Sequence, residues 1–332
     1  MGNSNNESKF WVGFDLGGTK MYAAAFNSEL KQVGSPKKTP TKGHEGPKKG
    51  VARIIETIEK TLKGAEISKS DLGGIGIGCP GVVDLKNGVL LDATNLGWLD
   101  VKIGPELSEA FGGIPVSVLN DVDAGTFGEY HVGCGSDATN LLGVFPGTGL
   151  GAGAIINGQL VSGARISCME LGNMALPSAS LANAPKGSLR LEDVCSRLAI
   201  AAEAIQEAYR GGAPYLLKNF GTDLTKVKSR AIAESIENGD KAVERIVERA
   251  VHYMGMGVAA AVDMVGPDVV AVGGGLAEAM PEFFVKRLEK EVTRFAFAPL
   301  SAQAEFRLAK MGDDAVTIGA AAHCRDTHGK AA

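Results

Sequence analysis

Glycine occupies every second position between residues 147 and 153, within the stretch VFPGTGLGAGAIINGQL (144–160), and an apolar run lies on either side. Alternation at a period of two places all four glycines on one face of an extended segment. That face carries no side chains, which is typical of a backbone that something large approaches closely. The pattern predicts a strand, a glycine turn and a second strand over residues 140–158.

The chain opens with the same design. Residues 10–26, FWVGFDLGGTKMYAAAF, predict a strand, a tight turn at the paired glycines and a return strand. Two halves that each begin with such a hairpin, and in which strands then alternate with helices, indicate an α/β architecture with layered sheets. A ligand is then expected in the cleft between the halves.

Periodicity and turn residues predict the other elements. Apolar side chains at helical spacing predict helices over 48–62, 193–210, 240–265 and 313–328. Apolar runs predict strands that end at a Gly-Pro turn within 72–84, at residues 120–121, and at a glycine turn within 268–284. The polar stretch 28–50, broken by proline and glycine, is expected to be a solvated loop.

The composition excludes several classes of protein. The 332 residues are 45% apolar and carry a formal charge of −4, so no basic surplus points to nucleic acid or to an anionic membrane. No window reaches the length of a membrane span, and the polar residues 1–8 are expected to form a disordered tail, not a secretory signal. The five dispersed cysteines favour reduced thiols in the cytoplasm.

Both glycine turns have the chemistry of an anion site. In DLGGTK (15–20) and GTGLGAG (147–153), backbone N–H groups can converge on a phosphate, and a threonine hydroxyl adds a donor. Asp15 can hold Mg²⁺ through water, and Lys20 either neutralises charge or faces solvent. Neither turn matches a Walker A loop. Two ordinary glycine hairpins are the alternative, but two matched turns and the later VVAVGGG (269–275) together favour nucleotide binding.

The pair Asn120-Asp121 ends a predicted strand and supplies a carboxylate for proton transfer. Phosphoryl transfer to a hydroxyl needs a group that takes the proton of the acceptor. Asp121 is expected to face the cleft from the end of the strand, whereas Asp123 is expected to begin the following helix as its cap. We therefore assign proton acceptance to Asp121 and capping to Asp123. The alternative is that Asp121 is itself only a cap.

Seven motifs together carry a family resemblance. They are, in order, DLGGTK, GCPGVVD, NLGW, LNDVDAGTFGE, GTGLGAG, MELGNM and VVAVGGGLAE, and the similarity around them extends from about Val12 to about Ala322. This set resembles the ROK family of bacterial sugar kinases and repressors, within the hexokinase–actin ATPase superfamily. The resemblance implies two ribonuclease H-like domains of the actin/hexokinase type with a cleft between them. The repressors carry an N-terminal helix-turn-helix, which the short segment before the first strand disfavours here.

The resemblance also implies which residues bind the ligands. The residues assigned to ATP and Mg²⁺ are Asp15, Gly17, Gly18, Thr19, Lys20, Gly147, Thr148, Gly149, Gly273, Gly274 and Gly275. The residues assigned to the sugar are Gly81, Val82, Asn120, Asp121, Glu170, Asn173 and Glu192, with Thr94 and Asn95 matched more loosely. The family's base is the aspartate of its Asn-Asp pair, here Asp121.

The expected domains are a smaller N-terminal one, residues 9–121 joined by a returning helix at 312–330, and a larger one, residues 122–311. Closure of these domains would exclude water from the transferred phosphoryl group. Family members are commonly dimers or tetramers, and a homodimer is expected here.

The chain departs from the family at its zinc motif. The family pattern continues with Glu-x-Gly-His and a cysteine cluster, whereas Asn173 stands at the histidine position and no cysteine lies between Cys168 and Cys195. A protein without structural zinc is therefore expected. Asn173 can still donate and accept hydrogen bonds, so a sugar contact can survive there. Without the metal, the loop at 175–190 must be ordered by packing.

These observations favour an ATP-dependent hexokinase, with glucose at its 6-hydroxyl as the leading acceptor. Alternative acceptors are an N-acylated hexosamine such as N-acylmannosamine, mannose, fructose or allose. Polyphosphate is an alternative donor, for which the lysines within 37–49 are the one hint. A non-catalytic sugar sensor is the alternative from another class, and the presence of Asp15, Asp121 and Thr148 argues against it.

Overall fold

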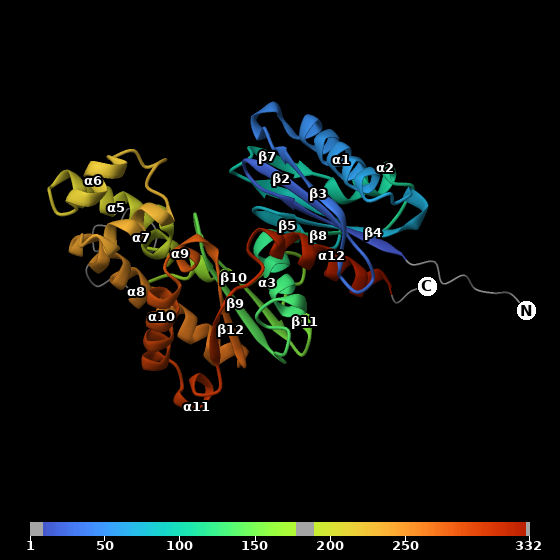
Figure 1. Cartoon of the computed structure of the whole chain (residues 1–332). Coiled ribbons are helices and arrows are strands. Elements are labelled where there is room, and N and C mark those ends of the chain that lie inside the picture. The colour runs from blue at the N-terminus through green and yellow to red at the C-terminus, as the bar shows by residue number, and fades with distance from the viewer. Residues whose placement is uncertain (1–8, 177–188, 330–332) are drawn as a thin grey trace, which may run out of the picture. The chain divides into compact units, whose positions relative to one another are not determined.

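The computed structural model describes residues 9–176 and 189–329 (Figure 1). The expected tail at residues 1–8 lies outside the described residues. The chain divides into two compact units. Unit 1 comprises residues 1–136, 160–168 and 313–332, and unit 2 comprises residues 137–159 and 169–312. Among the described helices, none has the length and apolar character that crossing a lipid bilayer requires.

A five-stranded sheet forms the centre of unit 1, in the order β3-β2-β1-β4-β8 (Figure 1). Its strands are β1 (Phe10–Leu16), β2 (Lys20–Phe26), β3 (Gln32–Pro40), β4 (Leu72–Cys79) and β8 (Val116–Asn120). The antiparallel β1–β2 hairpin confirms the one predicted over 10–26. Strands β1, β4 and β8 are parallel, so their carboxyl ends meet at one edge of the sheet.

The loop predicted over residues 28–50 is wrong in part, because β3 lies within it and pairs with β2. This strand lies at the edge of the sheet and is largely exposed. Lysine and proline are tolerated at sheet edges, where no second neighbour has to be bonded. The polar composition that indicated a loop is therefore equally that of an edge strand.

Helices cover both faces of the unit 1 sheet. Helices α1 (Pro47–Gly64) and α2 (Ile103–Ala110) pack from one side, and α1 confirms the helix predicted over 48–62. A small sheet of β5 (Val82–Asp84), β6 (Val89–Ala93) and β7 (Trp98–Val101) joins this core. Its Trp98 is fully buried, and the indole Nε1 donates to the Gly43 carbonyl at 3.0 Å.

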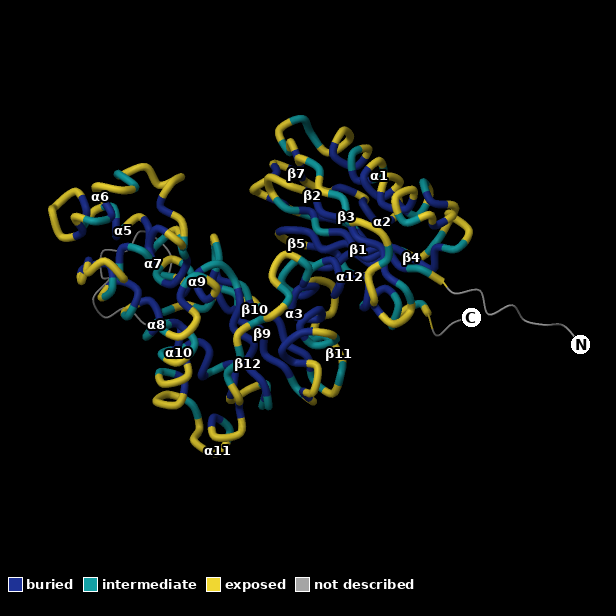
Figure 2. The backbone as a smooth tube through the Cα atoms, viewed as in Figure 1, coloured by how far each residue is buried: buried dark blue, intermediate teal, exposed yellow. Residues whose placement is uncertain are grey.

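Helix α12 (Ala315–His328) packs against β1, β4 and helix α3 (Asp121–Val132). A Cβ atom on Gly13 would overlap the carbonyl oxygen of Thr317, and one on Gly76 would overlap that of Ala320. The α12 backbone therefore lies directly on bare strand backbone. Most residues of β1, β4 and α12 are buried (Figure 2). The C-terminal helix predicted over 313–328 is confirmed.

Unit 2 repeats the design of unit 1. Its sheet has the order β11-β10-β9-β12-β13, with strands β9 (Leu141–Pro146), β10 (Leu150–Ile156), β11 (Gln159–Leu160), β12 (Val269–Val272) and β13 (Glu305–Leu308). Strands β9 and β10 form the predicted antiparallel hairpin, and β12 pairs in parallel with β9 and β13. The repeated hairpin and parallel strands confirm an α/β fold in which each unit is built on a five-stranded sheet.

The helices of unit 2 are α4 (Glu192–Cys195), α5 (Arg197–Tyr209), α6 (Pro214–Phe220), α7 (Ser229–Glu237), α8 (Lys241–Val265), α9 (Gly274–Ala279), α10 (Pro281–Phe295) and α11 (Ala298–Ser301). The single helix predicted over 193–210 is divided between α4 and α5. Ser196 interrupts it in an extended conformation, and its side chain accepts from the Ala199 amide to cap α5.

The division into units differs from the domain boundary expected at residues 121 and 122. Helix α3 belongs to unit 1, which continues to residue 136. The physical reason is its close packing on α12: Cβ atoms on Gly128 and Gly319 would overlap backbone carbonyl oxygens of the opposite helix. The short segment 160–168 also belongs to unit 1.

Candidate active site

The first glycine turn joins β1 to β2 in unit 1. Asp15 lies half-buried near the end of β1, residues 17–19 form the turn, and Lys20 begins β2. The Thr41 hydroxyl donates to the Gly17 carbonyl at 2.6 Å, and the Thr41 amide donates to the Thr19 carbonyl at 2.9 Å. Thr41 therefore holds the turn by donating hydrogen bonds to the carbonyl groups of two turn residues. The sequence patterns do not single out Thr41.

The parallel strands bring Asp15 and Asp121 to one edge of the sheet. Asp15 pairs in register with Gly78 on β4, and Cys79 pairs with Asn120 on β8. Burial raises the pKa of Asp15 from 3.8 to about 7, Asp121 adds to the rise, and Lys20 opposes it. Burial, and then the charges of the same two carboxylates, also hold the pKa of the Cys79 thiol well above its usual range.

Asn120 and Asp121 occupy the junction between β8 and α3. The Asn120 side chain accepts from the amides of Val122 and Asp123, so Asn120 is the cap and Asp121 is the first helical residue. The capping role predicted for Asp123 is wrong: Asp123 is buried inside the first turn and accepts from the Ser167 hydroxyl at 2.6 Å. Asparagine is as good a cap as aspartate, and it comes first along the chain.

The other predicted sugar residues of unit 1 surround this junction and the glycine turn. The Asn120 amide donates to the Gly81 carbonyl at 3.0 Å. Gly81 has a φ of 87°, and a Cβ atom there would overlap the Asp92 carbonyl oxygen, so the turn requires glycine. Val82 is exposed, and the Thr94 hydroxyl donates to Asp92 Oδ1 at 3.1 Å. Asn95 Nδ2 lies 3.2 Å from the Cβ position of Gly18.

Lys20 is held by an ion pair. Its Nζ lies 2.7 Å from Asp313 Oδ2, which Lys38 also approaches at 3.2 Å. The Tyr22 hydroxyl donates to the neighbouring Asp314 at 2.6 Å. The two acidic residues that precede α12 therefore contact the strand that leaves the glycine turn.

Replacing Asp15 by Asn is expected to stabilise the protein without ligands at neutral pH. The folded state retains a proton that the unfolded state releases, because the pKa is about 7 in the fold and 3.8 in the unfolded chain. Stability is therefore lost as the pH rises from about 4 to about 7, and the loss is complete above that range. We expect Asp15→Asn to gain at least about 1 kcal/mol at pH 8, or roughly 2–4 °C in Tm. Thermal unfolding at pH 4 and pH 8 tests this, and an equal gain at both values would contradict it.

The second glycine turn joins β9 to β10 in unit 2. The Gly147 amide donates to the Gly149 carbonyl at 2.9 Å. Arg197 contacts the turn twice: its amide donates to the Gly147 carbonyl at 2.9 Å, and its Nη2 donates to the exposed Thr148 hydroxyl at 3.2 Å. Arg197 is a site residue that no sequence pattern indicates, because its neighbours along the chain are those of an ordinary helix.

The third glycine turn connects β12 to α9. The Gly273 amide donates to the Val144 carbonyl at 2.9 Å, which joins the turn to β9. Gly274 has a φ of 76°, and its Cβ position lies 2.8 Å from the Pro146 carbonyl oxygen. Glycine is therefore required at Gly274, and the turn lies against the end of β9, directly before Gly147.

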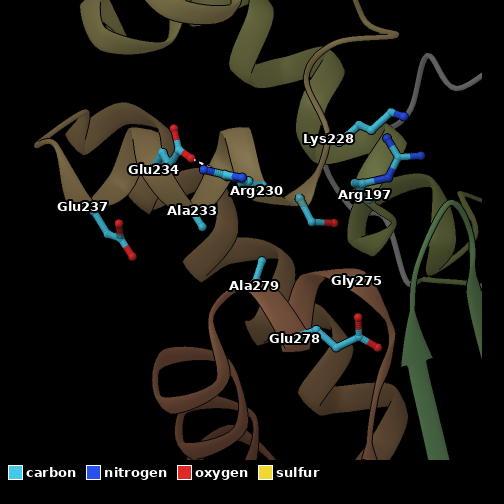
Figure 3. A pocket seen from close by; sticks show the side chains of 10 residues that line it. Arg197, Lys228, Arg230, Ala233, Glu234, Glu237, Gly275, Glu278 and Ala279 are labelled. Atoms are coloured by element: carbon cyan, nitrogen blue, oxygen red, sulfur yellow. Dashed lines mark hydrogen bonds and ion pairs between the residues drawn. The ribbon is translucent and has the colours of Figure 1, made fainter. Parts of the chain in front are cut away.

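A cavity of about 700 Å³ lies beside these two turns of unit 2 (Figure 3). Its lining includes Arg197, Lys228, Ser229, Gly275 and Glu278. Arg197 and Lys228 lie together on one side, and Glu234 and Glu237 lie on the other (Figure 3). Within the described chain, no carboxylate forms an ion pair with Arg197 or Lys228, whereas Arg230 is paired with Glu234 at 2.6 Å.

The predicted sugar residues of unit 2 form one network next to the Gly147 turn. The Asn173 amide donates to Glu170 Oε2 at 2.9 Å and its Oδ1 accepts from Arg190 at 3.2 Å, while Arg190 also lies 3.1 Å from Glu192 Oε1. Glu192 Oε2 lies 2.9 Å from the Cβ position of Gly149. Arg190 is a further residue that sequence patterns miss.

In the part of the chain that the structure describes, no three His, Cys, Asp or Glu side chains group as metal ligands. Most of the loop expected at 175–190 lies outside the described residues. The expectation that the protein lacks structural zinc stays a prediction.

The sequence and the structure of this chain are both similar to those of known proteins. A family model described as the ROK family matches residues 11–327. A glucokinase of Halalkalibacterium halodurans is 29% identical over 315 residues, which cover 94% of this chain and 93% of that protein. A xylose repressor of Caldicellulosiruptor bescii is 26% identical and covers 83% of this chain and 68% of its own length. A ROK family glucokinase from Streptomyces griseus, solved with glucose and AMPPNP, superposes with a TM-score of 0.78 at 26% identity and covers 96% of this chain and 99% of its own.

Proposed function

Because this chain belongs to the ROK family, we propose that it is a sugar kinase, which transfers the terminal phosphoryl group of ATP to a hexose. Glucose, at its 6-hydroxyl, is the first candidate for the acceptor, and similarity to glucokinases supports this choice. The single observation that carries the proposal is the proximity of Asp121 and Asp15 at the carboxyl edge of the parallel strands in unit 1.

We assign the general base to Asp121. As the hydroxyl oxygen bonds to phosphorus and ADP leaves, the hydroxyl proton passes to the Asp121 carboxylate. The Asn120 cap holds the start of α3, and this positions the carboxylate at the first helical residue. Proton transfer to a fixed carboxylate needs no reorganisation of the helix.

Asp15 is suited to hold Mg²⁺ through a water molecule. Its carboxylate is half-buried beside a second carboxylate, which raises its pKa, and an added cation offsets that repulsion. When bound, the ion neutralises charge that develops on the phosphoryl oxygens. Within unit 1, Gly17, Gly18 and Thr19 supply the turn next to Asp15, and Lys20 supplies a positive charge.

We assign nucleotide contacts in unit 2 to two glycine turns and the cavity beside them. Gly147, Thr148 and Gly149 are the proposed phosphate contacts of this unit, and residues 273–275 flank the adenosine. Arg197 supports this assignment, because it lines the cavity and also donates to the Thr148 hydroxyl. A guanidinium in that position can donate paired hydrogen bonds to the oxygens of a phosphate group.

We propose sugar contacts within each unit. In unit 1 these are Gly81, Val82, Thr94, Asn95, Asn120 and Asp121, and in unit 2 they are Glu170, Asn173 and Glu192. Carboxylates and amides are suitable partners for sugar hydroxyls because they accept and donate in pairs. The predicted homodimer in the cytoplasm stays a prediction.

A coupled ADP-release assay over a panel of sugars tests the proposal. The panel holds glucose, mannose, fructose, allose and N-acylated hexosamines, and a parallel assay follows sugar phosphate formation with polyphosphate as the donor. We expect turnover with ATP and the highest kcat/KM on glucose. Sugar binding without turnover on either donor would contradict the kinase and favour a sugar sensor.

A further inference from the structure

Two segments of unit 2 carry the proposed sugar residues and lie side by side. The Leu191 amide donates to the Met174 carbonyl at 2.9 Å, and the Leu176 amide donates to the Leu189 carbonyl at 2.7 Å. Ala175 and Arg190 form an antiparallel bridge between them. The first segment carries Glu170 and Asn173, and the second carries Glu192. The backbone joins the segments, but it leaves the side chains free to adopt other rotamers.

Arg190 joins the side chains of the two segments. Its Nη1 donates to Asn173 Oδ1 at 3.2 Å and lies 3.1 Å from Glu192 Oε1. Its Nε and Nη2 donate to the two carboxylate oxygens of Asp193 at 3.3 and 3.0 Å. The bidentate pair with Asp193 fixes the plane of the guanidinium, so Nη1 reaches Asn173 and Glu192 in a set direction.

These partners determine which way the Asn173 amide faces. A guanidinium only donates, so the atom of Asn173 that faces Arg190 is the oxygen. An ionised carboxylate only accepts, so the atom that faces Glu170 is the nitrogen. One orientation satisfies both neighbours, and the second N–H of Asn173 then remains to donate to a ligand oxygen. Of the carboxylate oxygens, Glu170 Oε2 and Glu192 Oε1 are engaged in this network.

We propose that Arg190 is a positioning residue of the sugar site, which fixes Asn173 and Glu192 so that they present one donor and carboxylate acceptors to the hydroxyls of a sugar. This inference rests on the proposed function, because that function assigns Glu170, Asn173 and Glu192 to the sugar. Arg190 acts through these side chains and needs no contact with the ligand. Its side chain is 47% exposed, so its role differs from that of a core residue.

Arg190→Gln tests the proposal by comparing its effect on the KM for the sugar with its effect on the KM for ATP. We expect KM and Kd for the preferred sugar to rise about tenfold or more, as for the loss of a hydrogen bond to a charged group. We expect the KM for ATP to stay within about twofold, because loss of ground-state sugar binding does not alter the nucleotide contacts. Arg190→Lys keeps the charge but loses the planar fork, so it should recover only part of the affinity.

Three comparisons make the test decisive. Arg210→Gln removes an exposed arginine that is paired only with Glu207 among the described residues. This variant should change neither the KM nor the Kd for the sugar. Arg190→Gln combined with Asn173→Ala should be less damaging than the two single effects added together, because one acts through the other. Calorimetric titration with glucose and the other panel sugars measures affinity without turnover, and thermal unfolding shows whether each variant is folded.

The outcomes separate this inference from the proposed function. An active parent whose sugar KM and Kd do not change in folded Arg190→Gln would overturn the role of Arg190, as would an equal rise in the KM for ATP. An inactive parent that still binds sugar would overturn the kinase, and the calorimetric comparison would then decide the role of Arg190. A parent that neither binds nor phosphorylates any panel sugar would overturn both.

Discussion

Asp121→Asn is expected to lower kcat by about 10²–10⁴-fold, the usual contribution of a general base. An amide cannot take the proton of the attacking hydroxyl, but it is nearly the same size as the carboxylate and still hydrogen-bonds to a sugar. The Asn120 side chain still caps α3, so the helix should begin at the same residue. The ADP-release assay measures turnover, and calorimetry measures sugar affinity, which should stay within a few-fold of the parent value.

Asp100→Asn is the matched control for this variant. Asp100 is an exposed residue of the same unit with a φ of 51°, a conformation that asparagine adopts readily. Asp100→Asn makes the same chemical change at a residue that is assigned to neither the sugar nor the nucleotide, so kcat and KM should both be unchanged. Near-normal turnover in Asp121→Asn would refute the assignment of the base.

Gly128→Ala is expected to destabilise unit 1 by about 3 kcal/mol or more, at the upper end of single substitutions. A Cβ atom on Gly128 would overlap the backbone carbonyl oxygen of Ala315 at the start of α12. Helix α3 and helix α12 would have to separate, because neither backbone can yield locally. Alanine is the better helix former by about 1 kcal/mol, so the packing loss must exceed that gain. Chemical denaturation of Gly128→Ala and of the parent protein measures the difference in the free energy of unfolding.

Gly125→Ala gives the control in the same helix and at the same interface. A Cβ atom there would lie 3.8 Å from the Val316 side chain, which is an ordinary contact. This variant should be neutral or more stable by up to about 1 kcal/mol, because only the helix propensity changes. Equal stability of the Gly125 and Gly128 variants would contradict the backbone contact between α3 and α12.

The sequence predicts the parts of the fold that depend on local pattern. Alternating glycines beside apolar runs predict both hairpins, and helical spacing predicts α1, α8 and α12 within a few residues. Strand β3 is missed because an edge strand has the polar composition of a loop. The break at Ser196 is missed because helical periodicity continues on both sides of it.

The sequence likewise predicts one part of the candidate site and misses another. The glycine turns and the Asn120-Asp121 junction are continuous in sequence, so their chemistry can be inferred from the residues alone. Arg190 and Arg197 act through partners that the fold brings to them, and each lies in a stretch with an ordinary helical or polar pattern. Thr41 holds the first turn from the end of β3, a strand that the sequence does not predict.

The contact of α12 with bare glycine backbone in β1 and β4 also determines when unit 1 can form during synthesis. Strands β1 and β4 leave the ribosome early, whereas residues 315–328 follow the whole of unit 2. At about 5–20 residues per second, the wait between the end of β4 and the end of α12 lasts roughly 12–50 s. During that interval one face of the first sheet lacks its covering helix, and a chaperone that shields the nascent chain would act on this face until translation reaches α12.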